Sequence, residues 1–287
     1  MLTNVDHLVI VVPDIQTALE RYARLGFHVH ETGALEGTGT RSAIVYHETQ
    51  HLELLAVEDP ERAGAHLTAY AAAGGGLRWI VLASDDLAAD VVAMRGRGVE
   101  VTDPMPRART TPSGARLEWL LATLVGEDAP PLLFVQHLSD LDARQRQVPE
   151  RAPHPNGILG IERIYIAGTS LDGMVEAYSR VLGGPPPTTQ DGIIIKANMA
   201  MYTFGQSQVV VGEAYGPGPT QDAMDARGPG PFQAIHRSND ITASAAWLAA
   251  HEVTPAATGR RANGELVLLV GPHNAFGYNL GFVGRDD

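Results

Sequence analysis

The feature that most constrains the fold is a unit that recurs four times along the chain: an apolar strand, a capped helix and a glycine stop. In the first copy the strand covers residues 6–12, and Asp14 is a good N-cap for the helix that follows. Apolar residues then recur at spacings of three and four, from Ile15 to Leu25, and Gly26 ends the helix. About three more strands follow. A repeat on this scale indicates one supersecondary unit per copy, so the fold is built from four of them.

The other three copies share this frame, and their first strands begin at residues 77, 160 and 232. The residues that cap their helices are Asp86, either Thr169 or Ser170, and Asp240. The pattern therefore predicts an α+β chain of four βαβββ modules. When the caps are aligned on Asp14, Asp86, Thr169 and Asp240, the equivalent first-strand residues are His7, Trp79, Glu162 and Gln233.

The modules are expected to pair into two domains. Residues 1–140 hold modules one and two, and residues 158–287 hold modules three and four. Between them, residues 141–157 are polar and contain several prolines, which is typical of a linker. Residues 215–231 are dense in Gly and Pro, which predicts a loop joining modules three and four.

Composition excludes several kinds of function. The net charge of -12 argues against binding to nucleic acid or to an anionic membrane, because no basic surplus exists. The absence of cysteine excludes disulfides, zinc-thiolate sites and Cys nucleophiles. No signal sequence and no apolar run near ~18 residues is found, so we expect a cytoplasmic location. The expected partner is a small molecule, and edge strands make a homodimer plausible.

Several short segments resemble the glyoxalase-like branch of the vicinal oxygen chelate superfamily. They are 5–14 (VDHLVIVVPD), 25–27 (LGF), 37–40 (GTGT), 51–54 (HLEL) and 154–157 (HPNG). The resemblance covers the first domain well, and the second domain follows it in repeat pattern. It implies two half-open barrels, each made of two modules around a cavity. In such cavities a divalent metal, held by first and last strands of the modules, chelates two neighbouring substrate oxygens. Members include glyoxalases, epimerases, extradiol dioxygenases and metal-free drug-sequestering proteins, so the fold does not fix the reaction.

His7 and Glu53 match metal positions of that family, on the first and fourth strands of module one. An imidazole and a carboxylate suit Fe, Mn, Zn, Ni or Co as divalent ions, whose identity the sequence leaves unknown. Glu53 could also act as the catalytic base. The alternative is structural: His7 would be a hydrogen-bonded residue at the end of a strand, and Glu53 would pair with an arginine such as Arg41.

The third metal ligand is less clear. Trp79, at the position equivalent to His7, cannot ligate but could stack on a planar substrate. Strand alternation points only one of Gln136 and His137 inward, and alignment with Glu53 favours Gln136 as a ligand or substrate contact. His51 shares a face with Glu53 and is a further option. Arg109, with two other arginines at 107 and 116, could bind an acidic substrate, although such arginines are more often solvated.

The second domain offers fewer ligands. Its equivalent positions carry Glu162, Gln233, approximately Glu213, and Gly281. The family's four-module extradiol dioxygenases build an iron site there from two His and one Glu, and this set is missing. A metal-dependent lyase or isomerase acting on a small oxygenated substrate therefore ranks above an extradiol-type dioxygenase. The alternatives are a metal-free protein that binds and sequesters a small molecule and, third, a protein whose partner is another protein.

Overall fold

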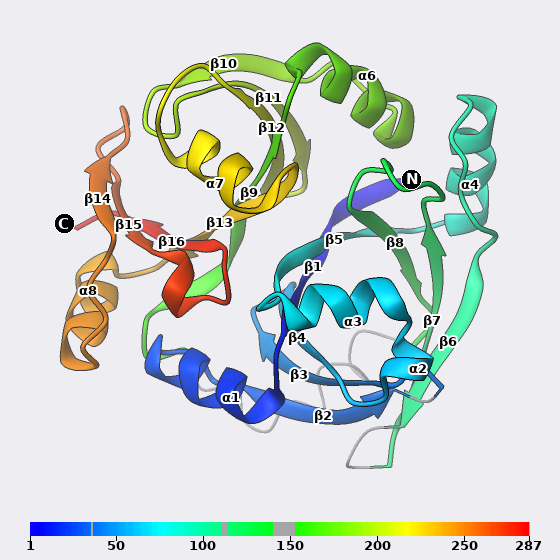
Figure 1. Ribbon diagram of the computed structural model, residues 1–287, viewed down its shortest axis with the longest axis horizontal. Coiled ribbons are helices and arrows are strands. Elements are labelled where there is room, and N and C mark those ends of the chain that lie inside the picture. The colour runs from blue at the N-terminus through cyan, green and yellow to red at the C-terminus, as the bar shows by residue number, and fades with distance from the viewer. Residues whose placement is uncertain (36, 111–113, 140–152, 287) are drawn as a thin grey trace.

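The computed structural model describes residues 1–35, 37–110, 114–139 and 153–286. It confirms the predicted α+β architecture of paired modules, which form two curled sheets of eight strands each (Figure 1). Most of the predicted linker, residues 141–152, lies outside the described residues. No helix among the described residues is both long and apolar enough to cross a membrane.

The first sheet is built from modules one and two. Module one consists of β1 (Leu2–Val12), α1 (Ile15–Arg24), β2 (His30–Leu35), β3 (Thr40–Tyr46) and β4 (His51–Val57). Module two consists of β5 (Gly76–Ser84), α4 (Leu87–Gly96), β6 (Met105–Thr110), β7 (Arg116–Thr123) and β8 (Leu132–His137). The strand order is β2-β3-β4-β1-β5-β8-β7-β6, so the two modules join where β1 pairs antiparallel with β5.

The second sheet repeats this plan. Module three consists of β9 (Ile158–Gly168), α6 (Leu171–Leu182), β10 (Thr188–Gly192), β11 (Ala197–Phe204) and β12 (Ser207–Ala214). Module four consists of β13 (Gly230–Ser238), α8 (Ile241–Ala250), β14 (Ala257–Arg260), β15 (Leu266–Val270) and β16 (Asn279–Gly284), with a short 3₁₀ turn, η1 (Pro272–Asn274), before β16. The order is β10-β11-β12-β9-β13-β16-β15-β14.

The helix caps hold as predicted, with one refinement. Asp14, Asp86 and Asp240 each accept a hydrogen bond from a backbone N–H three residues later. In module three the cap is Ser170, not Thr169. This shifts the alignment by one residue, so the equivalent of His7 in module three is Arg163 rather than Glu162.

Within the described residues, three helices lie outside the repeat. They are α2 (Pro60–Ala63), α3 (Ala65–Ala72) and α7 (Pro219–Arg227). The predicted loop at 215–231 was therefore wrong over α7, where Pro219 occupies the first helical turn, a position at which its missing N–H costs nothing. Met224 of α7 packs against the apolar cluster that includes Met199 and Phe232 of the second sheet.

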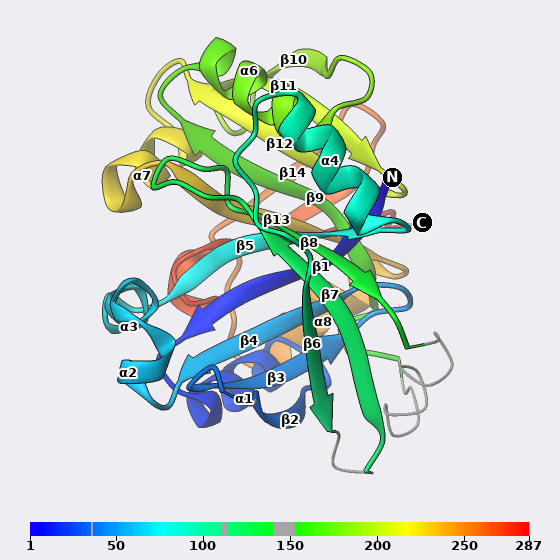
Figure 2. The same ribbon diagram turned by 90° about the vertical axis from the view of Figure 1, so that its right-hand side faces the viewer.

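The two halves share one continuous hydrophobic core. Figure 2 shows the two sheets stacked, with β5 and β13 in contact where they meet. Gln50 crosses this junction, because its Nε2 donates to Ser207 Oγ at 2.7 Å and its Oε1 accepts from the Ile161 amide at 2.8 Å. The hydroxyls of Tyr22 and Tyr278 meet at 2.9 Å in the same buried layer. The halves are therefore packed together by specific polar contacts as well as by apolar area.

Three buried histidines gather around Phe27 at this junction: His47, His154 and His236. The ring centroid of His47 lies 5.5 Å from that of His154 and 5.7 Å from that of His236. Burial lowers the pKa of His154 and of His236 to about 4, and it lowers the pKa of His47 well below its usual range. All three are therefore neutral in the folded protein near pH 7.

This cluster predicts acid lability. Between pH 6.5 and about 4 the unfolded chain binds these protons and the folded chain does not, so stability falls as pH falls, by up to about 1.4 kcal/mol per pH unit for each histidine. Urea unfolding measured across this range gives the slope. His236→Gln should reduce this slope by about 1.4 kcal/mol per pH unit, which is the contribution of one proton. The exposed His66→Gln should leave the slope unchanged. Equal slopes for the wild type and both variants would contradict the assignment.

Candidate metal and substrate site

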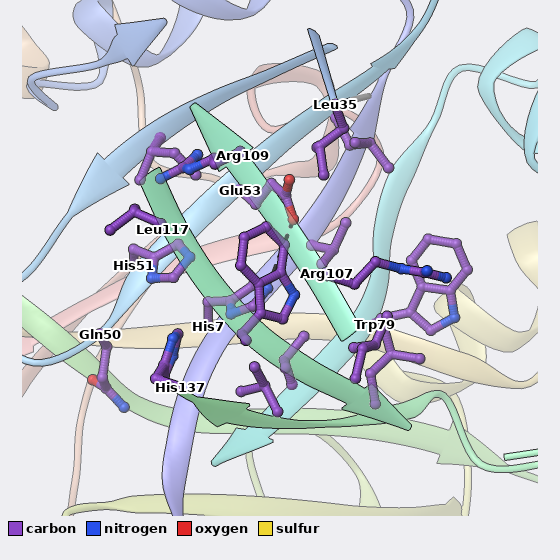
Figure 3. A pocket seen from close by; sticks show the side chains of 18 of the residues that line it. His7, Leu35, Gln50, His51, Glu53, Trp79, Arg107, Arg109, Leu117 and His137 are labelled. Carbon is purple, nitrogen blue, oxygen red and sulfur yellow. Dashed lines mark ion pairs between the residues drawn. The ribbon is translucent and has the colours of Figure 1, made fainter. Parts of the chain in front are cut away.

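A cavity of about 280 Å³ occupies the concave face of the first sheet (Figure 3). Its walls are mostly apolar, with Val9, Val81 and Val135 beneath and the indoles of Trp79 and Trp119 beside them. Its polar lining includes His7, His51, Glu53, Arg109 and His137. A concave apolar site with a few converging polar groups is the usual form of a ligand pocket.

Asp6 organises two of these histidines. Its Oδ1 lies 2.6 Å from Nδ1 of His7, and its Oδ2 lies 2.7 Å from Nε2 of His137. Asp6 sits at a β-bulge, where β1 slips by one residue against β5 between Val5 and His7, and such bulges redirect side chains. Hydrogen bonds from both histidines outweigh the effect of burial and hold the pKa of Asp6 well below its usual range. The carboxylate therefore fixes both imidazole rings.

His7 in turn faces Glu53. Its Nε2 lies 3.6 Å from Oε2 of Glu53, whose Oε1 accepts a 2.5 Å hydrogen bond from Ser42. Burial opposes the charged form of both residues, but their hydrogen bonds prevail and place the pKa of His7 at about 9 and that of Glu53 at about 2. The position between His7 and Glu53, which favours a proton, is also suited to a metal cation.

The donor set fits a divalent metal ion. Two ligands about 2.1 Å from one tetrahedral ion lie about 3.4 Å apart, close to the His7–Glu53 separation. Each ligand also has an outer partner, Asp6 behind His7 and Ser42 behind Glu53, as metal ligands in proteins usually do. Such partners set the tautomer and direction of a ligand before any ion binds.

His51 is the best third donor. Its ring stacks on His7 with centroids 4.2 Å apart, and in the part of the chain that the structure describes no hydrogen bond occupies its nitrogens. Donor atoms of Asp6, His7 and His51 lie within 4.8 Å of one another. Because both oxygens of Asp6 already contact imidazoles, Asp6 is better suited to orient these rings, which leaves His51 as the candidate third ligand.

Not every predicted residue reaches the cavity. His7, Glu53, Trp79 and Arg109 line it, but Gln136 does not: its Oε1 accepts the Leu87 amide at 2.9 Å, at the start of α4. The prediction that Gln136 points into the cavity was wrong, because it rested on aligning Gln136 with Glu53.

The register shows the cause. Glu53 pairs with Val9 of β1, and the corresponding residue, Leu133, pairs with Val81 of β5. Gln136 is three residues further along, and an odd shift exchanges the two faces of a strand. His137, on the other parity, is the residue that enters the cavity. Alternation outward from Leu133 would have found it.

The alternative role of Glu53, an ion pair with Arg41, is not found in the structure. Arg41 does not approach Glu53; it forms ion pairs with Glu31 and Glu58. Asp6 was missed because simple alternation puts it on the face opposite to His7, and only the bulge brings the two side chains together.

The second sheet builds a different interior. Glu162, the equivalent of Asp6 by the corrected alignment, pairs with Arg237 at 2.9 Å and with Arg261 at 2.5 Å. Glu162 is thus ion-paired with two guanidinium groups, whereas its equivalent in module one, Asp6, contacts two histidines.

The other positions of the second sheet at which metal ligands were considered do not form a site either. Glu213 accepts the Leu171 amide at 2.8 Å and so caps α6. At Gly281 a Cβ would overlap Cδ1 of Ile235, so the side chain of Ile235 fills the space where a ligand side chain was expected. Gln233 is buried. The described residues of the second sheet therefore do not reproduce the His7–Glu53 arrangement.

Known proteins share both the sequence pattern and the fold of this chain. Residues 5–182 match the glyoxalase-like domain family, which is more than half of the chain. The chain belongs to this family. It is thus a member of the vicinal oxygen chelate superfamily, as the two sheets of paired βαβββ modules also indicate. No curated protein matches it.

Solved structures share the fold over nearly the whole chain. A hypothetical protein from Staphylococcus aureus aligns with a TM-score of 0.67 and 14% identity, covering 97% of this chain and 98% of that one. A mutant of 4-hydroxymandelate synthase from Streptomyces coelicolor aligns with a TM-score of 0.69 and 14% identity, covering 99% and 92%. At such identity the likeness establishes the four-module fold of this glyoxalase-like protein and nothing of its substrate.

Proposed function

We propose that this glyoxalase-like protein is a divalent-metal-dependent enzyme that acts on a small oxygenated substrate in the first cavity. The observation that carries the proposal is the His7–Glu53 pair, 3.6 Å apart and supported from behind by Asp6 and Ser42. A pair held this way, in a cavity with mainly apolar walls, is preorganised for an ion that only two or three side chains must hold.

The residues divide the work as follows. A bound ion would supply Lewis-acid polarisation of neighbouring substrate oxygens. His7, Glu53 and His51 would hold it. The low pKa of Glu53, about 2, favours its role as ligand over that of catalytic base. His137 is the candidate for proton transfer, because Asp6 engages its Nε2 and its Nδ1 has no hydrogen-bond partner among the described residues. Proton transfer of this kind suits a lyase or isomerase.

Metal analysis tests the proposal. Protein purified without chelator and then loaded with Mn, Fe, Co, Ni or Zn should hold about one ion per chain. The ion that binds should raise the melting temperature, because an ion at 100 times its Kd adds about 2.7 kcal/mol to the stability of the folded state. Less than a fifth of an ion per chain after loading, with no thermal shift for any ion, would overturn the proposal.

The rival function is metal-free sequestration of a small apolar molecule. The specific observation in its favour is the wall formed by Trp79 and Trp119 with Val81 and Val135, which suits a planar ligand. Ring cleavage by an extradiol-type dioxygenase ranks third, because Glu162 and Gly281 leave the second half without the expected iron ligands. The metal analysis above separates the first two functions.

A further inference from the structure

Two arginines of edge strand β6, in module two, line the cavity. Arg107 pairs in register with Trp119 and Arg109 with Leu117, and all four residues line the cavity. Directly paired residues of antiparallel strands point to the same face, so both guanidinium groups belong to the concave side (Figure 3). The cavity therefore joins an apolar body to two positive charges.

These two charges have no carboxylate partner within the part of the chain that the structure describes. Arg109 has one weak contact there, from Nη2 to the Tyr46 hydroxyl at 3.4 Å, and Arg107 contacts only the Pro106 carbonyl. Nearby Arg116, by contrast, pairs with Glu118 at 3.0 Å. In a chain of net charge -12, two guanidinium groups that line one cavity without an acidic partner among the described residues favour an anionic ligand.

Arg109 stands at the same end of the cavity as the candidate metal ligands. Its contact Tyr46 is the register partner of His51, and their ring centroids are 6.1 Å apart. His51 stacks on His7. One small ligand can therefore touch both the arginine and the metal end.

We propose that the substrate carries a carboxylate that binds Arg109, assisted by Arg107, while its apolar body lies against Trp79 and Trp119. This inference rests on the proposed function and adds the substrate class: a compact organic acid with further oxygens beside its carboxylate. A planar guanidinium grips a carboxylate through two parallel hydrogen bonds, which an amide cannot reproduce. The cavity volume of about 280 Å³ suits a molecule of metabolite size.

Binding of a matched pair of probes tests the inference. Hydrocinnamate and hydrocinnamide have the same size and shape and differ in one terminal group, a charged carboxylate or a neutral amide, and neither has vicinal oxygens that would chelate a metal. Quenching of tryptophan fluorescence reports binding, because two of the chain's three tryptophans line the cavity. In metal-free protein the acid should bind at least tenfold more tightly than the amide.

Variants identify the responsible charge. Arg109→Gln should remove the preference for the acid and leave the affinity for the amide unchanged, and Arg109→Lys should keep part of the preference. Arg180→Gln, which removes an exposed charge on α6, is the matched control and should behave as wild type. Retention of the fold is checked by the melting temperature of each variant.

The outcomes are distinct from those of the metal test. Equal affinities for acid and amide, no saturable quenching by the acid at millimolar concentration, or an equal loss for both probes in Arg109→Gln would overturn the inference. Because the probes bind without metal, a preference for the acid in a protein that takes up no ion would support the carboxylate site while the proposed enzyme function fails.

Discussion

Replacing His7 by Ala is expected to lower affinity for the divalent ion by more than about 100-fold, the upper limit measured when only an outer partner of a ligand is removed. His7 presents Nε2 directly to Glu53, and among the described residues no other side chain occupies that position. Metal content by elemental analysis and titration of the apo protein measure the effect. The exposed His66→Ala on α3 is the control and should bind metal as wild type does.

Asp6→Asn should give an intermediate result. It preserves size but removes the charge that holds the imidazoles of His7 and His137, so metal affinity should fall about 10–100-fold. The ordering is the informative part: wild type, then Asp6→Asn, then His7→Ala. If His7→Ala retains wild-type metal content, the ion is bound somewhere else and the assignment of the site is wrong.

Gly75→Ala is expected to destabilise the protein by at least about 3 kcal/mol, among the larger effects that single substitutions produce. A Cβ at Gly75 would overlap the carbonyl oxygen of Val11, and the backbone there has a φ of +69°. Val11 belongs to β1, which carries Asp6 and His7, so the strand cannot move away without disturbing the site. Urea or thermal unfolding measures the loss.

The neighbouring Gly74 provides a matched control. It also has a positive φ, of +97°, but no described atom outside its immediate neighbours would lie within 4 Å of a Cβ added there. Gly74→Ala should therefore cost only the conformational strain, about 1–2 kcal/mol. Equal losses for the two variants would show that strain alone matters and that the contact with Val11 does not.

The sequence predicted the candidate site only in part. His7 and Glu53 were named because they match metal positions of the family. Trp79 was named because it is equivalent to His7 in module two, and Arg109 because it is one of three nearby arginines that could bind an acidic substrate. Gln136 was placed on the wrong face because its register was inferred from an alignment that was off by an odd number of residues. Asp6 and His137 could not be joined from the sequence, because they are 131 residues apart and meet only through the bulge in β1.

The sequence by itself determined the four-module frame, because caps such as Asp14 and stops such as Gly26 act within one or two turns of chain. The sequence also favoured the first half as the place of a site, because the second half offers fewer ligands. Tertiary structure alone decided how the candidate groups come together. In the first sheet a bulge brings Asp6 to His7 and His137, whereas in the second sheet Ile235 fills the space above Gly281. Such outcomes depend on register and on contacts between distant segments, which local sequence patterns do not encode.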